Sequence, residues 1–275
     1  MNTRVLERPE ELIEVAWSCT EDFESLPWYR GQANARWQLQ PEVARPEILR
    51  GLDPRQFEDH MAKSFRRQAE ARLPEGQRSR RWADWLALMQ HHGLPTRLLD
   101  WSTSILIAAF FAVHDPERLD LDGVIWALDP LRLNGNELGQ RQLVTADDRV
   151  GSLACMLPFR SLAAFDLDNE QRELAEQLEN AVVAMEPHEA FARMLLQQSR
   201  FTVHGRSTPL EETRDAARFL RRFVVPARKK VHFAQTLGLL GIRLSTVFPD
   251  LDHLAEELCD LSELRLRRPA RKHSA

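Results

Sequence analysis

The segment QHHGLPTRLLDWSTS, residues 90–104, carries the densest group of chemically active side chains in the sequence. An imidazole can exchange a proton near neutral pH, and a guanidinium can form paired hydrogen bonds with a phosphate or carboxylate. Buried polar groups without partners cost about 1–3 kcal/mol each, so we expect either a rigid hydrogen-bond network or a ligand site. The side chains concerned are His91, His92, Arg97, Asp100, Ser102, Thr103 and Ser104.

The charged members of this segment allow more than one interpretation. Arg97 and Asp100 stand three apart among leucines and a tryptophan, which predicts an internal ion pair, or hydrogen bonds to nearby backbone, as the simplest role. His91 and His92 close a predicted helix, where the negative end of the dipole favours a protonated imidazole. We expect one histidine to donate a proton or hydrogen bond to a ligand and the other to face solvent. Adjacent helical residues point apart, and no zinc-like spacing occurs, so we predict no metal.

A second candidate lies at Tyr29-Arg30-Gly31. Glycine would let the backbone approach a ligand closely, and the Arg30 guanidinium could hold a phosphate or carboxylate. The alternative is an arginine that bridges strand carbonyls. The hydroxyls of residues 102–104 most simply cap the next helix. Together with Arg30 they would instead hold a phosphorylated or ribose-containing ligand at that helix N-terminus.

The elements that must position these residues follow from hydrophobic spacing, prolines and glycines. The pattern predicts one α+β domain in which residues 96–112 pack behind a sheet, residues 130–170 are loop-rich, and a basic tail over 265–275 frays. Predicted strands cover 28–32, 123–128, 181–185, 201–204 and 223–226. Predicted helices begin at Pro9 and cover 54–72, 82–92, 105–113, 188–197, 228–240 and 251–261.

Composition excludes several classes of protein. The chain has 275 residues, 43% of them hydrophobic, and a net charge of −4, which by itself implies neither a nucleic-acid nor a membrane partner. No run approaches about 20 apolar residues, so we expect no membrane span. Three widely spaced cysteines predict reduced thiols and a cytoplasmic location. The sequence contains no phosphate-binding loop, dinucleotide fingerprint or serine-hydrolase elbow.

Two local basic patches have alternative interpretations: a solvated surface, or a site for a polyanion or an acidic partner protein. Acidic runs over 166–189 and 250–263 balance them. The first patch comprises Lys63, Arg66, Arg67, Arg72, Arg78, Arg80 and Arg81, and the second comprises Arg214, Arg218, Arg221, Arg222, Arg228, Lys229 and Lys230.

These motifs together resemble the FRG domain, which is named for a (Phe/Tyr)-Arg-Gly motif. The corresponding segments are residues 29–32 (YRGQ), 90–102 (QHHGLPTRLLDWS), 198–202 (QSRFT), 240–242 (LGI) and 248–251 (FPDL). The resemblance runs from about residue 28 to 258. We therefore predict an FRG domain over 1–264, followed by the tail at 265–275.

The order of the motifs is also similar to that of ADP-ribosyltransferases with an arginine, a Ser-Thr-Ser element and a glutamate. This looser resemblance implies a small, curved, split, antiparallel-rich sheet flanked by helices, with NAD as substrate and cleavage of the nicotinamide glycosidic bond. It implies catalytic roles for Arg30, His91, Ser102 and Gln198. It implies ligand-binding roles for Tyr29, Arg30, Gly31, His92, Arg97, Asp100 and Thr103.

The chain departs from both patterns at three positions. Gln198 stands where the transferases have a glutamate, His92 where the FRG pattern has an aromatic, and Ser199 where it has a glycine. The leading prediction is an ADP-ribosyltransferase-like effector or toxin that binds NAD. The alternatives are a non-catalytic nucleotide-sensing or protein-interaction module, in bacterial phage defence or with an antitoxin partner, and a nucleic-acid-binding protein.

Overall fold

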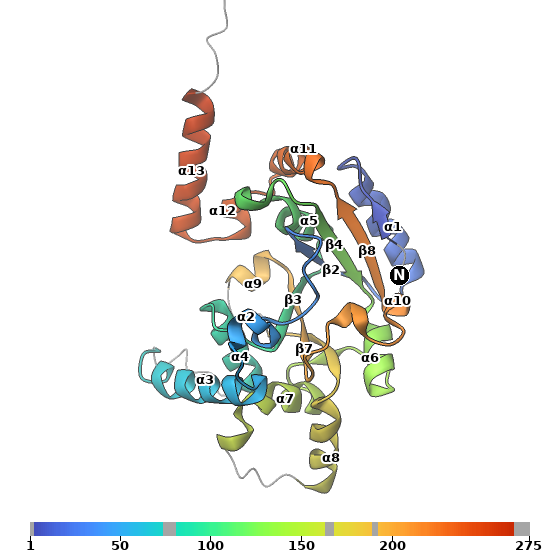
Figure 1. Cartoon of the computed structure of the whole chain (residues 1–275), viewed down its shortest axis with the longest axis vertical. Helices are drawn as coiled ribbons and strands as arrows, with labels where there is room; N and C mark the ends of the chain where they lie inside the picture. Colours follow the sequence, from blue (N-terminus) through green and yellow to red (C-terminus); the bar gives the residue numbers. More distant parts are fainter. Residues whose placement is uncertain (1–2, 74–80, 163–167, 189–191, 267–275) are drawn as a thin grey trace, which may run out of the picture.

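An eight-stranded mixed sheet forms the centre of the computed structural model, which describes residues 3–73, 81–162, 168–188 and 192–266 (Figure 1). Its strand order is β1-β8-β4-β2-β3-β7-β6-β5, and the sheet is not closed. Only β1 with β8 and β5 with β6 pair in parallel. The strands are β1 (Thr3–Val5), β2 (Trp28–Gln32), β3 (Leu98–Ser102), β4 (Gly123–Leu128), β5 (Val144–Thr145), β6 (Val182–Glu186), β7 (Ser199–His204) and β8 (Leu220–Val225).

The sheet consists of two four-stranded halves that meet at one place. Strands β2 and β3 share a single registered pair, Tyr29 opposite Ser102, whereas β2 pairs with β4 and β3 with β7 along their whole lengths. The predicted α+β class with an antiparallel-rich sheet flanked by helices is confirmed, although the sheet is larger than expected. The likeness to ADP-ribosyltransferases stays a prediction.

Helices cover the sheet, and their positions correct part of the sequence prediction. Residues 130–162 are not loop-rich, because they contain α6, β5 and α7, and residues 163–167 of the predicted loop-rich segment lie outside the described part. Residues 98–102 form a central strand, not part of a packing element behind the sheet. The helices are α1 (Glu11–Asp22), α2 (Pro46–Leu49), α3 (Pro54–Ala69), α4 (Trp82–His91), α5 (Ile105–Val113), α6 (Pro130–Leu138), α7 (Arg149–Met156), α8 (Asn169–Leu178), α9 (Ala192–Leu196), α10 (Ala216–Phe219), α11 (Ala227–Leu239), α12 (Leu244–Val247) and α13 (Leu251–Leu266).

Helix α5 anchors the half of the sheet that carries β2. It is apolar on nearly every side, and most of its residues are buried against β2, β4, α1 and α11. Ser104 caps its first turn by accepting a hydrogen bond from the Ile107 N–H at 3.4 Å. A Cβ at position 31 would lie 1.7 Å from the Ala108 carbonyl oxygen, so Gly31 allows β2 to pack directly on this helix.

A second core packs α3, α4 and α7 against the half of the sheet that carries β3, β7 and β6. On the opposite face a third core joins both halves through side chains that include Trp101 of β3 and Trp126 of β4. These three cores hold the junction of β2 and β3 from both faces. Both strands are therefore rigid supports for the polar side chains at that junction.

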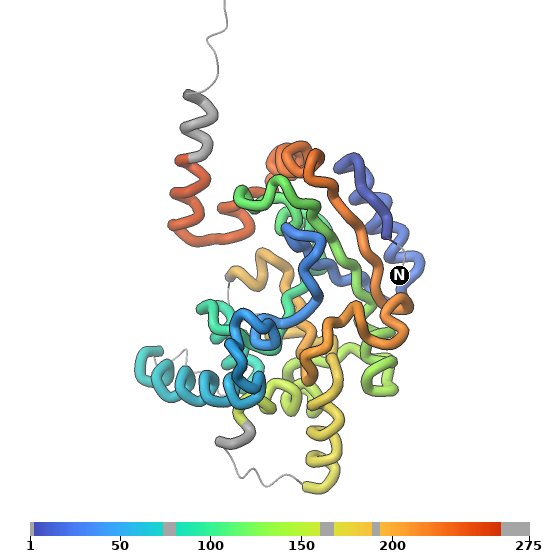
Figure 2. Tube along the Cα trace, in the orientation of Figure 1, coloured from blue at the N-terminus to red at the C-terminus, as the bar shows by residue number. Residues whose placement is uncertain are grey.

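The two ends of the chain behave differently. The N-terminal strand β1 lies beside β8, near the other end of the sequence (Figure 2). Helix α13 projects from the body and contacts α12 (Figure 1). It covers the first two residues of the predicted tail, and residues 267–275 lie outside the described part. Among the described residues, no helix combines the length and the apolar character needed to span a bilayer.

Candidate active site

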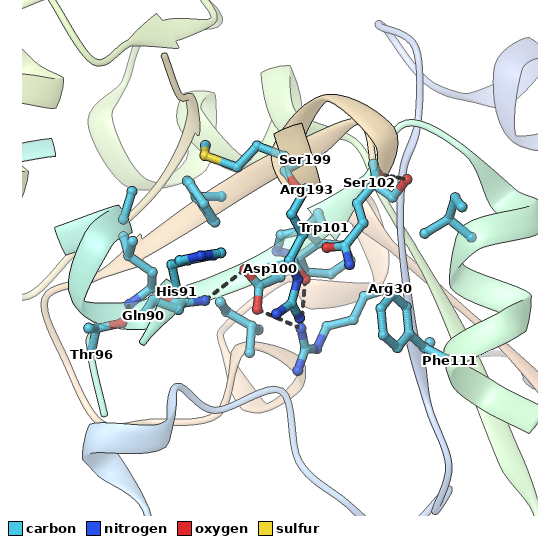
Figure 3. Close-up of a pocket in the computed structure, with 18 of the residues that line it drawn as sticks. Arg30, Gln90, His91, Thr96, Asp100, Trp101, Ser102, Phe111, Arg193 and Ser199 are labelled. Atoms are coloured by element: carbon cyan, nitrogen blue, oxygen red, sulfur yellow. Dashed lines mark hydrogen bonds and ion pairs between the residues drawn. The ribbon is translucent and has the colours of Figure 1, made fainter. Parts of the chain in front are cut away.

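A cleft of about 330 Å³ opens where β2 and β3 separate beyond their single registered pair (Figure 3). Its walls come from three separate parts of the chain: β2, the consecutive elements α4, β3 and α5, and α9. This volume is at the lower end of the range for small-molecule sites. Six residues singled out from the sequence line the cleft: Tyr29, Arg30, Gly31, His91, Asp100 and Ser102.

Arg30 and Asp100 form the polar centre of the cleft (Figure 3). Arg30 Nη1 donates to the backbone oxygen of Asp100 at 2.7 Å and lies 4.0 Å from its carboxylate. Arg30 follows the residue at which β2 and β3 pair, so its side chain crosses the gap between the two strands. The Asp100 side chain is 57% exposed, which leaves its carboxylate accessible from the cleft.

A relay of hydrogen bonds orients the Asp100 carboxylate. Gln90 Nε2 donates to Asp100 Oδ1 at 2.7 Å, and Thr96 Oγ1 donates to Gln90 Oε1 at 2.5 Å. Gln90 comes from α4, whereas Thr96 precedes β3 and is buried. The relay therefore ties the carboxylate to a buried anchor and restricts its rotation.

Arg30 retains unused hydrogen-bonding capacity. Its Nε atom is buried and has no hydrogen-bond partner among the described residues. Burial lowers the pKa of Arg30 to about 10, while the negative charge of Asp100 opposes that shift and the positive charge of Arg45 adds to it. The group remains a cation at neutral pH. A buried cation with a spare donor is a favourable partner for an anionic ligand.

His91 lines the cleft and His92 does not, although both residues are exposed. The His92 ring centroid lies 6.5 Å from that of Phe65. That one of them donates to a ligand stays a prediction. Partial burial lowers the pKa of His91, and the nearby positive charges of His92 and Arg193 lower it further. The neutral imidazole therefore predominates at pH 7, contrary to the protonated form expected at a helix end. A neutral imidazole can accept a proton.

The hydroxyls of residues 102–104 mainly support the loop that follows β3. Ser102 Oγ donates to the Gln197 carbonyl oxygen at 2.7 Å and accepts from the Ser104 N–H at 3.0 Å. Thr103 Oγ1 donates to Gln198 Oε1 at 2.8 Å. Neither Thr103 nor Gln198 lines the cleft. The neighbouring residue Gln197 does line it.

Arg97 lies outside the cleft, and its predicted ion pair with Asp100 is wrong. The Arg97 guanidinium donates to Glu58 Oε2 at 2.9 and 2.7 Å, and the Arg97 backbone N–H donates to Glu58 Oε1 at 3.0 Å. Both side chains are buried. The partner of Arg97 comes from α3, far from it in the sequence, so local spacing could not reveal the pair.

Several cleft residues were missed by sequence reasoning. Gln90 lies within the quoted motif, where its polar side chain before two histidines was the available signal. The others come from segments without a motif: Glu42, Arg45, Phe111 and Arg193. Tyr29 was expected at the site, and its ring is 3% exposed in the core with α5, so burial raises the pKa of its hydroxyl.

The candidate metal ligands and the two basic patches do not add residues to this cleft. Within the described ranges, no cluster of three or more His, Cys, Asp or Glu residues is arranged to hold a metal ion. The second basic patch is dispersed: Lys230 is fully buried and donates to backbone oxygens, whereas Arg228 and Lys229 pair with Glu7. In the first patch, residues 78 and 80 lie outside the described part.

We compared the chain with protein-family models, curated proteins and solved structures. No curated protein and no solved structure gives a significant match. Residues 25–120 match the family model described as FRG domain. That segment is about a third of the chain, and it carries Arg30, the Gln90–Asp100 relay and α5, but not α9 or β7. The chain therefore contains an FRG domain, and that domain supplies the polar centre of the cleft.

Proposed function

We propose that this protein is a cytoplasmic, ADP-ribosyltransferase-like effector or toxin that binds NAD in the cleft and cleaves its nicotinamide glycosidic bond. The observation that carries the proposal is the convergence of Arg30, His91 and Asp100 on one cleft from three separate elements. An arginine beside an oriented carboxylate suits a ligand that bears both a pyrophosphate and a cationic ring.

The charges in the cleft match the two ends of such a ligand. The spare Nε donor of Arg30, together with Arg45, supplies positive charge for a pyrophosphate. The Asp100 carboxylate supplies negative charge for the nicotinamide ribose. A cleft of about 330 Å³ accommodates part of a dinucleotide and leaves the rest at its open side.

The proposed reaction breaks the bond between the ribose C1′ and the nicotinamide nitrogen. The electron pair of that bond leaves with nicotinamide, which becomes neutral, and the ribose develops oxocarbenium-like positive charge. The oriented Asp100 carboxylate stabilises this charge. Water or a hydroxyl of a macromolecule then attacks C1′, and neutral His91 accepts the proton that the nucleophile loses. Asp100 thus supplies the carboxylate that position 198 lacks.

Nicotinamide release from NAD by the purified chain tests this proposal. We expect the wild-type protein to release nicotinamide and the Asp100→Asn and Arg30→Gln variants to lose that activity. Asp120→Asn is the matched control, because Asp120 is exposed and does not line the cleft. If wild-type protein releases no nicotinamide and NAD does not raise its melting temperature, the proposal is wrong.

The second candidate is a non-catalytic nucleotide-sensing module, for instance one that responds to phage or acts with an antitoxin. The favouring observation is that position 198 is a glutamine held by Thr103, outside the cleft. Under this alternative NAD binds, Arg30→Gln abolishes the binding, and no nicotinamide appears in any variant.

A further inference from the structure

A second concave site lies at another part of the fold and is lined mainly by arginines. This arginine hollow has a volume of about 470 Å³ and shares no lining residue with the cleft. Its lining residues include members of α6, which follows β4, and of α10, which precedes β8. Figure 1 shows α6 and α10 close together and apart from α9. Four arginines and one carboxylate line it: Arg132, Arg141, Arg218, Arg221 and Glu24.

Two of these arginines belong to the framework of the hollow. The Arg132 guanidinium donates to the backbone oxygens of Asp22 and Arg218, at 2.6 and 3.2 Å. The Arg221 guanidinium donates to two backbone oxygens near α10 and pairs with the Asp22 carboxylate. Arg132 also pairs with the carboxylates of Asp129 and Glu24, at 3.3 and 3.4 Å. These two guanidiniums therefore hold the framework of the hollow.

The other two arginines have donors to spare. Arg141 Nη1 donates to Glu24 Oε1 at 2.7 Å, its only hydrogen bond recorded among the described residues. The Arg218 side chain has no hydrogen bond or ion pair within those residues, although its backbone oxygen accepts from Arg132. A Cβ at position 135 would lie 2.6 Å from Arg141 Cγ, so Gly135 makes room for the stem of Arg141. Arg141 is therefore seated against α6 with its guanidinium over the hollow.

We propose that the arginine hollow binds a compact anion that carries two or more linked phosphates, such as a nucleoside diphosphate. Arg141 and Arg218 would each direct paired N–H groups at phosphate oxygens. A concave site favours a compact ligand, whereas a nucleic-acid strand requires a continuous basic track. The last residues of the second basic patch do not extend the hollow into such a track, because Lys229 and Lys230 lie in α11 at the other end of β8, where Lys229 pairs with Glu7 and Lys230 is buried.

Calorimetric titration of the whole chain with inorganic pyrophosphate tests this site. We expect the double variant Arg141→Gln/Arg218→Gln to lower affinity about tenfold or more, the usual effect of losing charged hydrogen bonds. The charge-matched control is Arg36→Gln/Arg214→Gln, two exposed arginines outside the hollow, which should leave the affinity unchanged. Glu24→Gln should raise affinity about two- to fivefold, because it releases Arg141 and removes a repulsive charge.

The same titration distinguishes pyrophosphate binding at the hollow from binding at the cleft. Arg30→Gln should leave pyrophosphate binding at the hollow intact, whether or not the protein cleaves NAD. The proposal is overturned if Arg30→Gln abolishes binding and the hollow double variant does not, or if pyrophosphate does not bind at all. It is also overturned if a single-stranded oligonucleotide binds through these arginines while pyrophosphate does not.

Discussion

Two arginine–carboxylate pairs lie along β3, and they differ in almost every physical respect. Arg97, just before the strand, and Glu58 are both buried and bonded through three hydrogen bonds. Asp100, in the middle of the strand, lies 4.0 Å from Arg30 of β2, with one buried Arg30 Nε atom unpaired and the Asp100 carboxylate 57% exposed.

The difference separates a structural pair from a binding pair. A fully satisfied buried pair has no donor or acceptor left for a ligand, and removing either partner leaves an uncompensated charge in the core. A half-satisfied pair in an open cleft retains donors, charge and access. The residue types are the same, so their partners and exposure determine which pair can interact with a ligand.

The largest expected effect comes from breaking the buried pair. Glu58→Ala should lower the free energy of unfolding by about 3–5 kcal/mol, because it leaves the Arg97 guanidinium unpaired in the core. Urea denaturation measures this change. Glu179→Ala, which removes the partner of the half-exposed Arg55, is the control and should cost about 1 kcal/mol or less. Equal losses in the two variants would contradict a structural role that is particular to Glu58.

The matching change in the open pair should affect activity instead of stability. We expect Asp100→Asn to reduce nicotinamide release by on the order of 10²–10³, the range seen when an electrostatic stabiliser is removed. Its free energy of unfolding should change by about 0.5 kcal/mol or less, because the side chain is largely exposed. A loss of stability comparable to that of Glu58→Ala would remove the distinction between the two pairs.

The pH dependence of stability should originate beside the buried pair. His204 lies next to Arg97, and burial, followed by nearby arginine charges, lowers its pKa from 6.5 to about 3. As pH falls below 6.5 the unfolded chain binds a proton at this residue and the native chain does not. The stability contribution is therefore complete above pH 6.5 and is lost as pH falls toward 3.

Urea denaturation at a series of pH values measures this effect. We expect His204 to contribute a slope of at most about 1.4 kcal/mol per pH unit between those limits. His204→Gln should flatten the profile, whatever its effect at pH 7. An unchanged slope would mean that another group carries the acid sensitivity.

The smallest expected effect concerns the relay that orients Asp100. Gln90→Leu should lower the rate of nicotinamide release about tenfold, the equivalent of one hydrogen bond to a charged group, with little change in KM for NAD. Thr96→Val, one step further from the carboxylate, should have a weaker effect. Steady-state kinetics distinguishes these outcomes, and a change in KM alone would assign Gln90 to ligand binding.

The sequence identified the segments that form the site but not how their side chains are paired. The motif at 90–104 and Tyr29-Arg30-Gly31 both supply cleft residues, and the functional roles expected of them stay predictions. Spacing favoured an Arg97–Asp100 pair, because they are close in the chain and share an apolar context. Strand geometry separates them, and each side chain has a different partner.

Gly31 is a second case in which the sequence identified an important position but not its contacts. Its position beside Arg30 suggested close approach to a ligand, but the carbonyl of Ala108 occupies the space that a Cβ would need. The 130–170 segment has weak periodicity because α6 and α7 are short and Leu133, Leu153 and Cys155 bury against neighbouring elements.

The sequence by itself determined the α+β class, the apolar helix behind the site and the residue types available for chemistry, because local hydrophobic spacing and capping specify such elements. Only the tertiary structure decided which arginine is satisfied and which has a donor to spare. Burial and hydrogen-bond partners depend on contacts between segments far apart in the chain, such as Glu58 of α3 with Arg97 and Arg30 of β2 with Asp100 of β3.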